Sequence, residues 1–112
     1  MVRFSRFLLL ALIGLPLAAT RVAAEEPVFT LTIKDHRYMP AEFEVPANIK
    51  IKLLVKNEDG SPEEFESAEL HREKVVLGNS EISVFIGPLK PGRYEYIGDF
   101  HQESAHGVIT AK

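Results

Sequence analysis

Histidine is the residue type in this sequence best suited to chemistry, and it occurs as His36, His71, His101 and His106. The last two lie five residues apart in the stretch GDFHQESAHG, between runs that are typical of strands, GRYEYI and VITA. Imidazole and carboxylate together form a ligand set suited to copper, iron, zinc or manganese. The stretch is therefore either a loop of metal ligands or a solvated turn.

Acidic residues supply the other candidate ligands. From Glu58 to Glu73 the chain holds seven carboxylates, opposed only by Arg72. In the extended segment EEFES, strand alternation places Glu64 and Glu66 on one face, where carboxylates repel each other unless a cation lies between them. The simpler alternative is a solvated edge strand.

The remaining motifs narrow the chemistry further. The sequence contains no cysteine, which excludes thiolate chemistry and disulfides, and no G-x-S-x-G, H-E-x-x-H or phosphate-binding glycine motif. Asp99, in the loop before the last strand, is a candidate ligand or a turn residue that hydrogen-bonds its own backbone. His71 lies in a charged stretch that favours a solvated face or a partner surface over a second metal site.

Short strands must position these groups. The segment VFTLTIK (28–34) alternates polar and apolar residues, and NIKIKLLVKN (48–57) does so with its apolar residues from Ile49 to Val55 facing inward. The segment AEFEVPA contains Pro46 and is expected at a sheet edge. Further strands are expected in EEFES, EISVFIG, RYEYI and GVITAK. The segment HRYMP is expected to be a turn. For AELHREKVV two alternatives stay open, a single helical turn and a loop that leads into a strand.

About seven short strands without a long helix predict an all-β fold, a single-domain β-sandwich with Greek-key connections. Loops at the same end of a sandwich converge, so distant parts of the chain can build one site. His36, after the first strand, can then approach His101 and His106, before the last.

The N-terminal segment predicts export. Residues 1–24 have a basic start, a short apolar run and small residues before EEP, which is the layout of a signal peptide cleaved near Ala24. An uncleaved anchor is the alternative, and no stable membrane insertion is expected after cleavage. The mature domain, 25–112, keeps ten basic and sixteen acidic residues, a net charge near −6 that argues against nucleic acid as a partner.

The stretch YEYIGDFHQESAHGVITA resembles the terminal metal loop of a cupredoxin. By that resemblance His101 takes the position of a ligand histidine, His106 falls near the ligand methionine, and Gly98 stands where blue-copper members have a cysteine. The segment NEDGSPEEF resembles the loop that supplies the other histidine, with Glu63 or Glu64 in its place. Without the thiolate, fast electron transfer of the blue-copper kind is not expected.

Three further segments, IKDHRYMPAEFEVPA, PEEFESAELHREKVV and GPLKPGRYEYIGDFH, resemble the EfeO-type cupredoxin-like family, cysteine-poor periplasmic proteins associated with bacterial iron or copper handling. The resemblance implies a periplasmic location and a copper or iron ion. It also implies work beside a membrane iron permease and a periplasmic iron-binding partner, and it adds His36 to the candidate ligands.

We therefore predict a periplasmic protein that binds a transition metal, copper or iron, at one end of a cupredoxin-like sandwich. His101 and Glu66 are expected at the centre of the site. The remaining ligands are expected to come from a pool of five residues: His106, Glu64, Asp99, His36 and Glu63. Two alternatives stay open, a copper-dependent ferroxidase with a nearby iron site and a metal-free module that docks a basic partner through residues 58–73.

Overall fold

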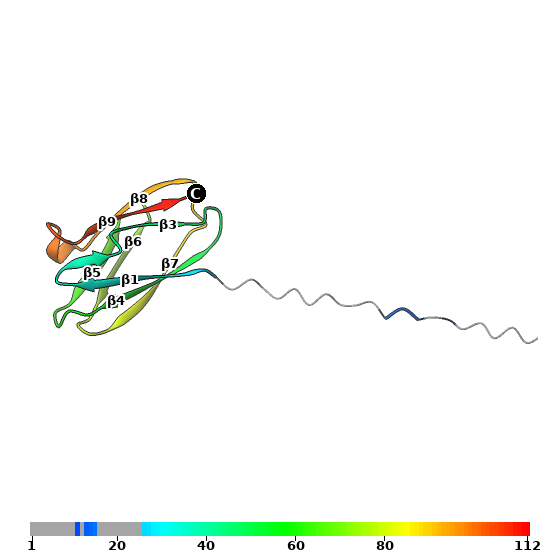
Figure 1. Ribbon diagram of the computed structural model, residues 1–112, viewed down its shortest axis with the longest axis horizontal. Helices are drawn as coiled ribbons and strands as arrows, with labels where there is room; N and C mark the ends of the chain where they lie inside the picture. Colours follow the sequence, from blue (N-terminus) through cyan, green and yellow to red (C-terminus); the bar gives the residue numbers. More distant parts are fainter. Residues whose placement is uncertain (1–10, 12, 16–25) are drawn as a thin grey trace, which may run out of the picture.

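In the part of the chain that the structure describes, nine short strands build two sheets that pack face to face (Figure 1). The computed structural model describes residues 11, 13–15 and 26–112. The first sheet has the order β2-β1-β4-β7, and the second has the order β3-β9-β8-β5-β6. The strands are β1 (Val28–Lys34), β2 (Arg37–Met39), β3 (Glu42–Val45), β4 (Ile51–Asn57), β5 (Glu63–Ser67), β6 (Arg72–Val76), β7 (Glu81–Ile86), β8 (Gly92–Ile97) and β9 (His106–Ala111).

The predicted all-β sandwich is confirmed, with nine strands in the described residues rather than about seven. The two additional strands are β2, in a stretch predicted to be a turn, and β6, in the stretch left open. Both are short and lie at the edges of their sheets. The pairs β1–β4 and β3–β9 are parallel, and the other paired strands are antiparallel.

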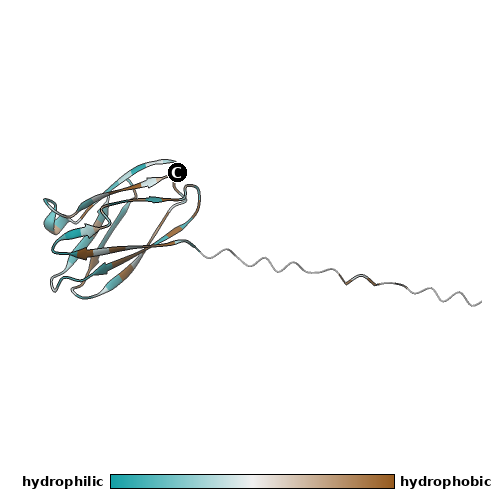
Figure 2. Ribbon diagram, viewed as in Figure 1, coloured by the Kyte–Doolittle hydropathy of each residue, from teal (hydrophilic) through white to brown (hydrophobic). Residues whose placement is uncertain are grey.

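The core lies between the sheets and follows the alternation of the strands. Leu31 and Leu53 of the first sheet are fully buried, as are Phe65, Tyr96 and Ile109 of the second. Hydrophobic and hydrophilic residues follow one another along the strands in Figure 2. One face of each sheet therefore packs on the other sheet, and the loops at each end of the sandwich are held close together.

Aromatic rings fix the middle of this core. The Tyr96 ring stacks on Phe65 with centroids 5.3 Å apart, and Tyr38 meets Tyr96 edge-on at 5.0 Å. Each such pair contributes about 0.5–1.5 kcal/mol beyond its buried area. Ile49, predicted to face inward, instead precedes β4 and is 41% exposed.

The N-terminal predictions fall mostly outside this part of the chain. Of the predicted signal peptide, residues 1–24, the structure describes only Ala11 and residues 13–15, so the segment and its cleavage site stay predictions. Within the described residues, no helix is both long and apolar enough to span a bilayer.

Candidate metal centre

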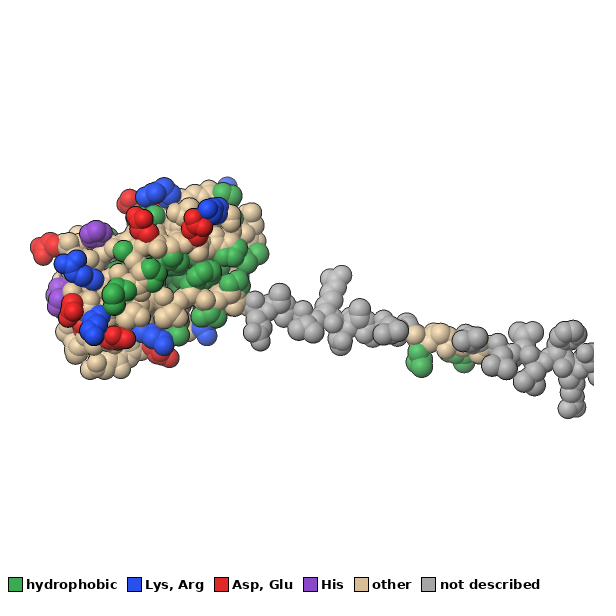
Figure 3. Space-filling view, viewed as in Figure 1, with side chains coloured by type: hydrophobic (Ala, Val, Ile, Leu, Met, Phe, Trp, Pro, Cys, Tyr) green, Lys and Arg blue, Asp and Glu red, His purple; other side chains and the backbone are tan. Residues whose placement is uncertain are grey.

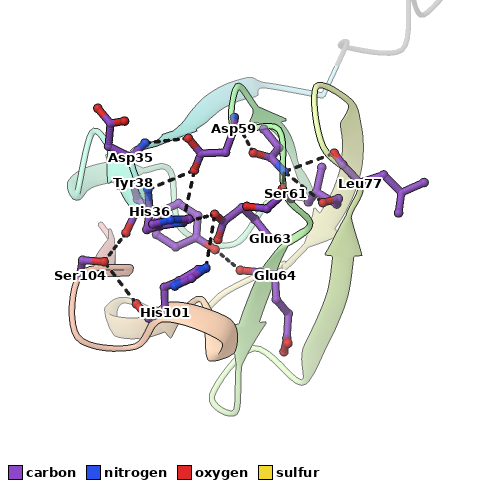
Figure 4. A network of polar contacts seen from close by, with 12 residues as sticks. Asp35, His36, Tyr38, Asp59, Ser61, Glu63, Glu64, Leu77, His101 and Ser104 are labelled. Atoms are coloured by element: carbon purple, nitrogen blue, oxygen red, sulfur yellow. Dashed lines mark hydrogen bonds and ion pairs between the residues drawn. The ribbon is translucent and has the colours of Figure 1, made fainter.

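Three side chains from distant parts of the chain converge at one end of the sandwich: His36, Glu63 and His101 (Figure 4). One ligand atom of each lies within 4.8 Å of the others. Glu63 Oε1 is 2.5 Å from His36 Nδ1 and 4.0 Å from His101 Nε2. The two imidazole rings stack with their centroids 3.5 Å apart. We call this set the histidine centre.

His36 is positioned by the hairpin between β1 and β2. The hairpin loop is only Asp35 and His36, both with positive φ (52° and 56°), as in a type I′ turn. Such turns favour Asn-Gly, so a turn made of Asp and His requires stabilising contacts from another part of the chain. Asp59 provides them, because its carboxylate accepts hydrogen bonds from the backbone N–H groups of Asp35 (2.8 Å) and His36 (3.1 Å).

Glu63 is the buried member of the histidine centre. It begins β5, where alternation turns it inward with Phe65 and Ser67, and it is 1% exposed. Its Oε1 is bonded to His36, but no described group hydrogen-bonds to Oε2. A buried carboxylate oxygen without a partner is costly unless a proton or a cation satisfies it.

His101 is held by the loop between β8 and β9. It ends a single 3-10 turn, η1 (Asp99–His101), and its carbonyl accepts a hydrogen bond from the Ala105 N–H at 2.8 Å. Ser104 Oγ donates a hydrogen bond to the His36 carbonyl at 2.6 Å and ties this loop to the β1–β2 hairpin. The two histidines therefore face each other because their loops are bonded together.

The histidine centre opens to solvent on one side. The side chains of His36 and His101 are 41% and 36% exposed. In Figure 3, histidine side chains reach the surface at the left end of the sandwich. An ion can therefore enter beside the imidazoles while Glu63 stays buried behind them.

The electrostatics of the histidine centre favour positive charge. The hydrogen bond with Glu63 raises the pKa of His36, with further contributions from the nearby carboxylates of Glu63, Asp59 and Asp35. Burial raises the pKa of Asp59, but the hydrogen bonds from the His36 and Asp35 amides outweigh it and keep that pKa below its usual value. A metal that binds here has to displace the proton of His36.

Gly98, which the sequence resemblance placed at the position of the blue-copper cysteine, has no room for a side chain. A Cβ on it would lie 2.9 Å from the Cβ of Ala105 and 3.1 Å from the Glu64 carbonyl oxygen. The Tyr38 hydroxyl, which donates to that same carbonyl, would lie at 3.6 Å. The space is filled by core groups, so a cysteine side chain at this position would collide with Ala105 and the Glu64 carbonyl.

The other predicted ligands do not join the histidine centre. Glu64, Glu66 and Asp99 form a second set, with one ligand atom of each within 4.8 Å of the others; we call it the carboxylate group. His101 and Glu66, predicted to share one centre, thus lie in different sets. His106 belongs to neither set; it is exposed at the start of β9, in register with Ile97.

Strand alternation explains the separation. Glu63 turns toward the space between the sheets, whereas Glu64 and Glu66 turn to the other face of β5. In Figure 4 the carboxyl of Glu64 points away from His36 and Glu63. Sequence reasoning missed that Asp59 holds the β1–β2 turn, because it counted Asp59 only among the seven carboxylates between Glu58 and Glu73. Its signal is in the segment NEDG, where the Asp59 N–H donates to Asn57 Oδ1 at 2.9 Å and fixes the loop.

The metal-free protein is expected to lose stability as the pH rises from about 5 to just above 7, because of Glu64. Burial, with the neighbouring charges of Glu66 and Asp99, raises the pKa of Glu64 to about 7. A carboxyl whose pKa is raised by folding stabilises the fold below its unfolded pKa, and that contribution is lost as the pH rises through the folded value. Between pH 5 and pH 8 the loss should be on the order of 2 kcal/mol.

Urea unfolding in the presence of a chelator measures this loss, with Glu64→Gln as the comparison. Glutamine cannot titrate, so the variant should lack this part of the pH dependence while keeping the part due to His36. Equal pH dependence in the two proteins would contradict the assignment to Glu64.

The donor set of the histidine centre fits a transition-metal ion. Two imidazoles and one carboxylate suit copper and zinc, which bind such ligands at about 2.0–2.2 Å. Two donors of one ion are then at most about 4.4 Å apart, so small side-chain rotations suffice to close the set. Glu63 Oε2 has no hydrogen-bond partner among the described residues, so a bound cation would satisfy this buried oxygen.

The chain belongs to the cupredoxin-like domain family, which it matches over residues 6–111. It is 52% identical over 79 residues to the uncharacterized protein RP394 of Rickettsia prowazekii (strain Madrid E). That match covers 70% of this chain and 63% of the relative, so the chain spans less than two thirds of the length of the curated relative. The narrower resemblance to EfeO-type proteins stays a prediction.

Solved structures show the same fold at low identity. Auracyanin A, a blue copper protein from Chloroflexus aurantiacus, is 13% identical with a TM-score of 0.67, covering 79% of this chain and all of its own. The metal-binding domain of the Streptococcus pneumoniae D39 Cu(I)-exporting ATPase CopA is 15% identical with a TM-score of 0.66, over 80% of this chain and 91% of that domain. Amicyanin from Paracoccus versutus is 15% identical with a TM-score of 0.60, over 82% and 86%.

Proposed function

We propose that this protein binds one Cu(II) ion at the histidine centre. The observation that carries the proposal is Glu63, a buried carboxylate with one oxygen unpartnered and two histidine rings beside it. For a given set of nitrogen and oxygen ligands, Cu(II) binds more tightly than the other divalent ions of the first transition row. The copper proteins among the structural neighbours lend this choice further support.

Each residue of the histidine centre has a separate task. His36 and His101 supply nitrogen donors, and His36 gives up its raised-pKa proton when it binds. Glu63 neutralises part of the charge of the ion from its buried side. Ser104 and Asp59 hold the two loops in place through the backbone of the hairpin. Bound copper would supply a Lewis acid and a one-electron redox centre, without the thiolate bond of blue copper.

The expected role is binding or carrying copper in the periplasm. A place beside a membrane iron permease, an iron-binding partner and a bound iron ion rest on the sequence resemblance alone and stay predictions, as does the ferroxidase alternative. The other alternative, a metal-free module that docks a basic partner through residues 58–73, is supported only by the negative charge of that stretch.

Calorimetric titration of the purified metal-free protein with Cu(II) and Zn(II) tests the proposal. Cu(II) should bind at one site, more tightly than Zn(II), and His36→Gly should weaken it by at least about 10-fold. Glycine adopts the positive φ of this turn easily, so the variant keeps the hairpin while losing the imidazole. His106→Ala is the matched control and should bind as wild type. A dissociation constant weaker than about 0.1 mM, or equal losses in both variants, would contradict the proposal.

A further inference from the structure

We propose that the carboxylate group, Glu64, Glu66 and Asp99, is a second cation site, separate from the histidine centre and built only from oxygen ligands. The group lies on the opposite face of β5 from Glu63. Its two glutamates are two residues apart on one strand, and η1 brings Asp99 against them. One ligand atom of each residue lies within 4.8 Å of the others.

Glu64 provides the observation that singles this group out from an ordinary acidic surface. Glu64 is only 3% exposed, and its Oε1 atom has no hydrogen-bond partner among the described residues. The ion pairs found in residues 26–112 include no Lys, Arg or His bound to Glu64, Glu66 or Asp99. A buried carboxylate oxygen without a partner among the described residues is costly, and a bound cation would satisfy it.

The neighbouring strand increases the negative charge instead of offsetting it. In the pairing of β5 with β6, Glu66 lies directly opposite Glu73. Like charges at such a position destabilise a sheet. Bound positive charge would relieve this repulsion as well as that within the carboxylate group, so the acidic pair is better explained by a ligand than by sheet stability.

The carboxylate group is open to solvent. A groove with a volume of about 420 Å³ runs past Glu66 and Asp99, and Glu69 and Glu95 add two more carboxylates to its walls. Asp99 is exposed and Glu66 half-buried, whereas Glu64 lies deeper. A cation can therefore enter through an acidic groove and meet the carboxylates of Glu66 and Asp99, with Glu64 as the deeper member of the group.

The ligand chemistry sets the class of ion. Carboxylates alone suit hard divalent cations such as Mn(II), Ca(II) and Mg(II), whereas imidazoles suit copper and zinc. Two adjacent strand positions, Glu63 and Glu64, would then serve two sites of different selectivity. We choose Mn(II) as the probe because its unpaired electrons report binding directly.

Mn(II) titration of the purified protein, followed by electron paramagnetic resonance of the free ion, tests the second site. One Mn(II) should bind with a dissociation constant of about 10–100 μM, in the range of moderately tight carboxylate sites. Glu66→Gln and Asp99→Asn should each weaken binding by at least about 10-fold. Prior loading with Cu(II) should leave Mn(II) binding unchanged if copper occupies the histidine centre.

Two control variants separate this proposal from its rivals. Glu73→Gln removes the opposing charge but no ligand, and Glu63→Gln alters only the histidine centre, so both should bind Mn(II) within about 3-fold of wild type. Absence of Mn(II) binding tighter than about 1 mM would overturn the second site. A loss in Glu73→Gln equal to that in Glu66→Gln would also overturn it, because it would show diffuse attraction to an acidic face. Cu(II) binding by the same variants reports on the histidine centre separately.

Discussion

Replacing Glu63 by glutamine is expected to weaken Cu(II) binding on the order of 100-fold, the largest effect of any single change at the histidine centre. The substitution keeps the shape of the side chain but removes the buried negative charge and the oxygen that has no partner. The nitrogen donors of His36 and His101 would remain, but an ion at the buried side would lose its only carboxylate ligand in this set. Competition titration against a chelator of known affinity measures the change.

Glu64→Gln is the matched control for that experiment. It makes the same substitution one residue along β5, on the other face of the strand, and should leave Cu(II) affinity within about 3-fold of wild type. The account is contradicted if the two variants lose affinity equally, or if Glu63→Gln binds Cu(II) as tightly as wild type.

Replacing Gly107 by alanine is expected to lower the free energy of unfolding by about 3 kcal/mol or more, because the new methyl group has nowhere to go. A Cβ at this position of β9 would lie 2.3 Å from the Ala41 carbonyl oxygen and 2.3 Å from the Tyr96 hydroxyl. Those two groups are hydrogen-bonded to each other at 3.0 Å. Tyr96 cannot yield without breaking its stack on Phe65, so the strain would spread into the core.

Urea unfolding of the metal-free protein measures the loss, and Gly92→Ala is its control. Gly92 lies in the neighbouring strand β8, where a Cβ would find its nearest atom at 3.8 Å, an ordinary contact. That variant should stay within about 0.5 kcal/mol of wild type. A Gly107→Ala protein as stable as Gly92→Ala would show that the packing around Tyr96 is not as tight as described.

Hydrophobic alternation predicted most of the fold but not its shortest strands. The segment 28–34 became β1 with the expected bounds, and 63–67 became β5. The strand β2 was missed because it has three residues, and because its Asp-His turn carries no Gly or Asn signal. That turn is held by Asp59, from a loop far along the chain. The residues of the turn itself carry no sign of these long-range hydrogen bonds.

The strand β6 was left open for a different reason. Four of its five residues are partly or fully exposed, and only Val76 is buried, so the strand lacks a two-residue period. Backbone pairing with β5 defines β6 as a strand, although its own hydrophobic pattern does not. Edge strands of this type take their structure from a neighbour.

Every member of the two ligand sets could be named from the sequence, but their grouping could not. Residue type alone made Glu63, Glu64 and Glu66 equal candidates, and alternation showed that Glu64 and Glu66 share a face. Which face of β5 meets the two histidine loops depends on how the sheets stack. The packing of the whole sandwich decides this, and it pairs His101 with Glu63.

The central claim is that His36 and His101 together hold one Cu(II) ion beside Glu63, and electron paramagnetic resonance of the protein with one equivalent of Cu(II) tests it most directly. The account predicts a single copper species with hyperfine splitting from two imidazole nitrogens and without the intense colour of a thiolate bond. His36→Gly and His101→Ala should each reduce the pattern to one nitrogen. A spectrum with no coordinated nitrogen, or a two-nitrogen pattern that survives both substitutions, would contradict it.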